Sequence, residues 1–139
     1  MFTFRGFTQK ANDALNQAIG SAAEMGHTYV GSEHLLIGLI REGSSVAAQV
    51  LREFSVETEP LERMLTETVG RGTPLVLTPR DFTPRAKKIL ELAAAEARSL
   101  GQKYVGSEHI LMAMVKENES YAMQFLRQMG IEPETLYEK

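Results

Sequence analysis

The hexapeptide Tyr-Val-Gly-Ser-Glu-His occurs twice in this chain of 139 residues, at residues 29–34 and at residues 104–109. A shift of 75 positions aligns the two copies and extends the match far beyond them. Between residues 7–64 and residues 82–139, 23 of the 58 ungapped pairs are identical, and most of the others are conservative. Two copies of one structural unit therefore fill the chain, and the fold must accommodate that unit twice.

Apolar residues recur at helical spacing in each copy, as in the run from Ala11 to Ala22. A threonine precedes the first such run of each copy and a glycine follows it, which suits an N-cap and a C-terminal stop. The pattern predicts an all-α fold of two paired four-helix bundles. The expected helices cover residues 9–25, 33–41, 45–54 and 58–69, then 84–100, 108–117, 120–129 and 133–139.

A chain of this length is enough for one ordinary domain. Residues 71–81 contain two prolines and no period, which is typical of a linker. We therefore expect a single domain over residues 1–139, with one repeat at 7–70 and the other at 82–139. The second copy lacks a counterpart of residues 65–70, which suggests an excerpt of a longer protein.

Composition argues against several classes of protein. The chain has no cysteine and three histidines, so neither a disulfide framework nor a structural zinc site is expected. Its net charge of −3 and pI near 5.7 argue against a nucleic-acid binder. Neither a signal peptide nor an apolar run long enough to span a membrane is seen, so we expect a cytoplasmic protein without a membrane partner.

Hydroxyl side chains stand at four predicted helix starts. These are Thr8, Ser32, Thr83 and Ser107. A helix start presents free N–H groups and a partial positive charge, so it can bind an anion. The alternative is that each hydroxyl is only an N-cap, worth about 1 kcal/mol. The residues alone leave both interpretations open.

Glu33 and Glu108 follow at the expected first residue of their helices. The local interpretation is that each carboxylate stabilises its helix start by ~0.3–1 kcal/mol. The functional interpretation is that each accepts a charge-assisted hydrogen bond from a guanidinium. The residues alone favour the local interpretation, but this set would suit a ligand with both a phosphate and a guanidinium.

His34 and His109 could be metal ligands or proton shuttles. No nearby residue completes a metal-ligand pattern, so hydrogen bonding to the adjacent loop is favoured. The chain also lacks a nucleophile–base pattern and the phosphate-binding loop of ATPases. An enzyme is therefore not expected, and no cofactor is expected in this domain.

Four stretches identify a family. They are FTQKANDAL, GHTYVGSEHLLIGLIREGSSVAAQVL, FTPRAKKILELAAAEARSLG and YVGSEHILMAMV. Over nearly its whole length the chain resembles the N-terminal domain of ClpC-type AAA+ unfoldases, and more broadly the Clp N domains. The resemblance implies two tandem four-helix repeats related by pseudo-twofold symmetry.

The resemblance also implies a receptor function. Such domains engage adaptor proteins and substrates, which ATPase rings absent from this chain unfold and thread into a ClpP-type protease. In Gram-positive members they also bind phosphoarginine, the degradation mark written by an arginine kinase. By motif match the phosphoarginine-binding residues are Thr8, Glu33, Thr83 and Glu108.

The chain departs from the family pattern in three places. Serine replaces the usual threonine of the motif at positions 32 and 107, extra residues precede Phe7, and residues 116–120 lack the usual glycines. The last departure puts adaptor contacts at that loop in doubt. The alternative function is an adaptor-docking module with no phosphoarginine recognition.

Overall fold

The computed structural model describes residues 2–117 and 120–131. The regular elements in these residues are all helices, as predicted. The first repeat contains α1 (Gln9–Glu24), α2 (Ser32–Glu42), α3 (Val46–Glu53) and α4 (Thr58–Val69). A single 3-10 turn, η1 (Pro79–Asp81), precedes α5 (Pro84–Ser99), α6 (Ser107–Lys116) and α7 (Tyr121–Gln128). The predicted helix at 133–139 lies outside the described residues, and the division of the chain at residues 70 and 82 stays a prediction.

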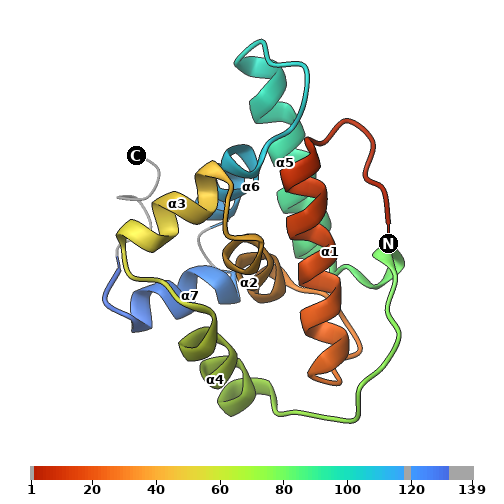
Figure 1. Ribbon diagram of the computed structural model, residues 1–139, viewed down its shortest axis with the longest axis vertical. Helices are drawn as coiled ribbons and strands as arrows, with labels where there is room; N and C mark the ends of the chain where they lie inside the picture. The colour runs from red at the N-terminus through yellow and green to blue at the C-terminus, as the bar shows by residue number, and fades with distance from the viewer. Residues whose placement is uncertain (1, 118–119, 132–139) are drawn as a thin grey trace.

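Helix α2 lies at the centre of the molecule, with α1, α3, α4 and α7 around it (Figure 1). It is apolar on almost every side, as a helix buried by its neighbours must be, and Leu35 to Leu39 are all buried. Gly38 allows α1 to approach closely, because a Cβ atom there would collide with the backbone of Ala14 and Ala18. The segment between α4 and α5 runs along the outside of the molecule (Figure 1). In the described part of the chain, no helix is long and apolar enough to cross a membrane.

The two repeats interlock through the repeated hexapeptide. Val30 forms a parallel backbone bridge with Phe82, and Val105 forms one with Phe7. Each bridge has two N–H···O=C bonds of 2.8–2.9 Å. A shift of 75 positions turns either bridge into the other with the repeats exchanged, which confirms the pseudo-twofold relation. The hexapeptide of each repeat is therefore held beside the first helix of the other repeat.

Two of the four predicted caps are wrong, those at Ser32 and Ser107. Gly31, not Ser32, is the N-cap of α2, and Ser32 and Glu33 are the first two helical residues. The reason lies in His34, whose Nδ1 accepts the Gly31 N–H at 2.9 Å and takes the place of a capping carboxylate. The same arrangement recurs at the start of α6.

Ser32 and Ser107 do not cap their own helices, and each caps a helix of the other repeat instead. Ser32 Oγ accepts the Ala122 N–H at the start of α7, and Ser107 Oγ accepts the Ala47 N–H at the start of α3, both at 3.2 Å. All four residues are buried. Each serine therefore satisfies a buried donor that water does not reach, and it ties the repeats together.

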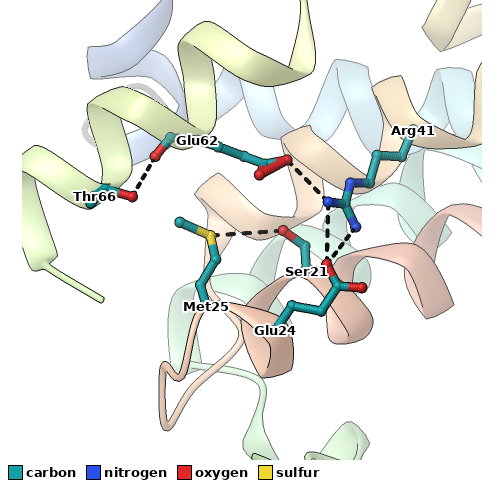
Figure 2. A network of polar contacts seen from close by, with 6 residues as sticks. All are labelled: Ser21, Glu24, Met25, Arg41, Glu62 and Thr66. Carbon is teal, nitrogen blue, oxygen red and sulfur yellow. Dashed lines mark hydrogen bonds and ion pairs between the residues drawn. The ribbon is translucent and has the colours of Figure 1, made fainter. Parts of the chain in front are cut away.

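A polar cluster fixes α4 against the first two helices (Figure 2). Arg41, in the last turn of α2, contacts Glu24 of α1 at 3.4 Å and Glu62 of α4 at 3.1 Å. Partly exposed pairs of this kind contribute less than about 1 kcal/mol each. The cluster therefore orients α4 more than it stabilises the fold.

We expect Ser32→Ala and Ser107→Ala each to lower the free energy of unfolding by about 1–2 kcal/mol, because each leaves a buried N–H without a partner. Urea unfolding measures the change. Ser99→Ala is the matched control: its hydroxyl bonds an exposed carbonyl within its own helix, and the expected change is under about 0.5 kcal/mol. Equal effects at the three positions would contradict the cross-repeat caps.

Candidate functional site

A pocket of about 380 Å³ lies where the two repeats meet. Its lining comes from both repeats: Tyr29, Gly31, Ser32 and Glu33 of the first, and Thr83, Arg85, Tyr121 and Gln124 of the second. The Val30–Phe82 bridge therefore brings Glu33 and Thr83 into the lining of one pocket. For the other two predicted site residues the structure shows the equivalent bridge, in which the Thr8 N–H donates to the Val105 carbonyl at 2.9 Å, and the pairing of Glu108 with Thr8 stays a prediction.

Both threonines are N-caps. Thr83 Oγ1 accepts the Ala86 N–H at 3.0 Å, and Thr8 Oγ1 accepts the Ala11 N–H at 3.1 Å. A hydroxyl has one hydrogen to donate and two lone pairs, so a cap uses a lone pair and leaves the hydrogen for a ligand. Capping and anion binding are therefore compatible at these positions.

Glu33 is the most unusual side chain of the pocket. It is 2% exposed, and its Oε2 has no hydrogen-bond partner. Its Oε1 accepts one long bond of 3.4 Å from Ser32 Oγ. Burial raises the pKa of Glu33, against the opposing effects of its own backbone N–H, Tyr29 and Ser32. A buried carboxylate with an unused oxygen in a pocket is typical of a binding site.

Glycine at position 31 makes room for that carboxylate. A Cβ atom on Gly31 would collide with the carboxylate of Glu33, and one on Gly106 would collide with that of Glu108. Neither glycine has a positive φ, so space rather than backbone conformation requires it. Each glutamate thus folds back over its own helix start.

Tyr29 forms a half-buried wall of the pocket. Its ring stacks on His27, with centroids 5.7 Å apart, and meets the edge of His34 at 5.3 Å. Burial and the nearby Glu33 carboxylate raise the pKa of Tyr29. The phenol is therefore protonated at neutral pH and can donate a hydrogen bond.

Two histidines hold the first hexapeptide in place. Because Nδ1 of His34 accepts a backbone N–H, its proton is on Nε2, which donates to His27 Nδ1 at 2.8 Å. His27 Nε2–H then donates to the Gly70 carbonyl at 2.8 Å. Burial and the neighbouring His27 lower the pKa of His34 to about 3, so it is neutral at pH 7. The predicted loop-holding role of His34 is confirmed.

The second repeat has only the first part of this series of hydrogen bonds. His109 Nδ1 accepts the Gly106 N–H at 2.8 Å, but its buried Nε2 has no partner. Gln102 stands where the first repeat has His27. Within residues 2–117 and 120–131, no three His, Asp or Glu side chains are placed to hold a metal ion.

Five residues that line the pocket were not among the predicted candidates: Tyr29, Gly31, Arg85, Tyr121 and Gln124. Tyr29 belongs to the repeated hexapeptide, so the repeat itself was a signal for it. Arg85 and Tyr121 gave none, because only the packing of one repeat on the other brings them to Glu33.

Comparisons with known proteins agree with this architecture. The family model described as "Clp repeat (R) N-terminal domain" matches residues 6–129. Chaperone protein ClpC1, chloroplastic, from Arabidopsis thaliana is 39% identical over 133 residues, which are 96% of this chain and 14% of that protein. The chain thus spans about one seventh of this relative's length.

Solved structures show the same fold. The N-terminal domain of the chaperone ClpD from Arabidopsis thaliana has a TM-score of 0.82 and 20% identity, covering 99% of this chain and 93% of that one. A ClpV N-domain in complex with a VipB peptide has a TM-score of 0.69 and 22% identity, covering 96% and 83%.

The raised pKa of Glu33 predicts a pH-dependent stability. Above its raised pKa, Glu33 is ionised in the folded protein and lowers the free energy of unfolding. Below the ordinary pKa of 4.5, the side chain is protonated in both the folded and the unfolded state, so this cost disappears. The stability advantage of Glu33→Gln over the natural chain should therefore grow as the pH rises from 4.5 to 8. Urea unfolding at both pH values measures it.

Glu108→Gln is the matched control, because Glu108 is only half-buried. It removes the same kind of carboxylate at the equivalent position of the other repeat. An advantage of Glu33→Gln that stays constant or shrinks toward pH 8 would contradict the account of Glu33.

Proposed function

The chain belongs to the Clp repeat N-terminal domain family, and on that basis we propose that it is the substrate- and adaptor-receptor domain of a ClpC-type protein unfoldase. In this proposal it binds phosphoarginine-marked proteins for delivery to ATPase rings and a ClpP-type protease in the parent protein. The domain itself is non-catalytic, needs no cofactor and works in the cytoplasm. The relatives named ClpC1 and ClpA homolog support the assignment to a ClpC-type unfoldase.

One observation carries the phosphoarginine assignment: the buried carboxylate of Glu33 has an unused oxygen in a pocket shared with Thr83. Phosphoarginine joins a guanidinium to a dianionic phosphoryl group. The guanidinium would pair with Glu33. The phosphoryl group would take the Thr83 hydroxyl and the positive start of α5.

The same arrangement selects against related ligands. Phosphoserine has no guanidinium, so its phosphate would face the Glu33 carboxylate and be repelled. Free arginine would pair with Glu33 but leave the start of α5 without an anion. Only a ligand with both charges, in the spacing of phosphoarginine, satisfies both sides of the pocket.

A second candidate function is adaptor docking without phosphoarginine recognition. It is favoured by the structure of a ClpV N-domain with a VipB peptide, a complex formed on this same fold. In that case Glu33 and Glu108 affect local stability only. Adaptor binding would then survive the loss of both carboxylates.

We expect the domain to bind free phosphoarginine at two sites in a calorimetric titration, with no saturable binding of phosphoserine or arginine at the same concentrations. Replacing both carboxylates, Glu33→Gln plus Glu108→Gln, should weaken phosphoarginine binding by at least about tenfold, because each site loses a charge-assisted pair.

The double variant must first be shown to be folded, by its circular dichroism and cooperative melting. Unchanged phosphoarginine affinity in this folded variant would contradict the proposal. Retained pull-down of an unmodified adaptor, with no phosphoarginine binding by the natural chain, would establish the adaptor-docking function instead.

A further inference from the structure

The two cross-repeat sites share most of their residues but differ at two positions. The glutamate, the threonine and the tyrosine of the hexapeptide are present in both. Tyr121, however, corresponds to Val46, and Arg85 corresponds to Lys10, each pair being 75 positions apart. Tyr121 and Arg85 both line the pocket around Glu33. The duplication therefore supplies a natural comparison between two versions of one site.

Tyr121 provides an aromatic face where the other site has an aliphatic side chain. It is the first residue of α7, is 46% exposed, and stacks on Phe125 with ring centroids 6.2 Å apart. It lies close enough to Tyr29 to contribute to the raised pKa of that phenol. A guanidinium between two tyrosines gains cation–π contacts. Val46 is 54% exposed, and its aliphatic side chain offers no such contact.

Arg85 provides a group that matches a phosphoryl group in shape. Its Nε lies 3.9 Å from Glu117, whose other oxygen pairs with Lys88 at 3.2 Å. Glu117 therefore keeps a partner when the Arg85 guanidinium turns into the pocket. Arginine binds phosphate through two parallel hydrogen bonds, whereas a lysine such as Lys10 acts as a point charge.

The carboxylates differ as well. Glu33 is almost fully buried with a free oxygen, whereas Glu108 is half-buried. Folding has already removed water from Glu33. A guanidinium that reaches it therefore gains a charge-assisted bond with little further desolvation of the protein.

We propose that the Glu33–Thr83 pocket is the high-affinity site of the domain and the Glu108–Thr8 site the weaker one, with Tyr121 and Arg85 setting the difference. This inference rests on the proposed function. Tyr121 covers the guanidinium and Arg85 pairs with the phosphoryl group. A protein with one mark then occupies the first pocket, and the second site fills when a second mark is present.

Reciprocal substitutions test the inference, with phosphoarginine as the probe and each site isolated by removing the other glutamate. In the Glu108→Gln background, Tyr121→Val should weaken binding about 3- to 30-fold, whereas Tyr121→Phe should retain it. In the Glu33→Gln background, Val46→Tyr should strengthen binding by a similar factor. Likewise, Arg85→Lys should weaken binding at the Glu33–Thr83 pocket, and Lys10→Arg should strengthen binding at the Glu108–Thr8 site.

The outcomes separate the two claims. Absence of binding by the natural chain overturns the proposed function, and this inference with it. Binding at two sites of equal affinity, or affinities that Tyr121→Val and Arg85→Lys leave unchanged, overturns the inference alone. Tyr121 and Val46 are exposed at equivalent helix starts, and the reciprocal substitutions at positions 121, 46, 85 and 10 each introduce the residue found at the equivalent position of the other repeat, so these variants are expected to fold.

Discussion

The pairing of each hexapeptide with the entry to the other repeat's first helix is the constraint on which the rest of the structure depends. The two backbone bridges, Val30 with Phe82 and Val105 with Phe7, fix how the repeats face each other. The first bridge also places Glu33 of one repeat and Thr83 of the other in the lining of one pocket. One repeat alone would supply only part of that lining, so the pocket depends on the duplication.

Nearly every residue of the hexapeptide has a separate role in this arrangement. The valine forms the bridge, the glycine leaves room for the carboxylate, and the serine caps a helix of the partner repeat. The histidine holds the helix start, which leaves the glutamate free to face the pocket. Stability and recognition are thus combined in six residues, and in the described part of the chain the two buried side-chain atoms without a hydrogen-bond partner, Oε2 of Glu33 and Nε2 of His109, both belong to the hexapeptides. Such local cost is expected where a ligand binds.

Local features of the sequence were enough to predict the fold. They were not enough to predict the long-range contacts that build the site. Apolar periodicity and the threonine caps were enough for the described helices, because these signals act within one turn or one helix. The role of Ser32 was mistaken, since a serine before a helix looks the same whether it caps that helix or another one. The pairing of Glu33 with Thr83, and the presence of Tyr121, depend on contacts between residues 50 to 90 positions apart. No periodicity records such contacts.

The central claim is that each site is built across the repeats, and counting sites in matched double variants tests it most directly. Glu33→Gln with Thr83→Val removes both groups of one cross-repeat site, whereas Glu33→Gln with Thr8→Val removes one group from each site. Both variants lose one carboxylate and one cap, so their stabilities are comparable. Calorimetric titration with phosphoarginine should find one remaining site in the first variant and none in the second. The reverse result, one site in the second variant and none in the first, would contradict the account.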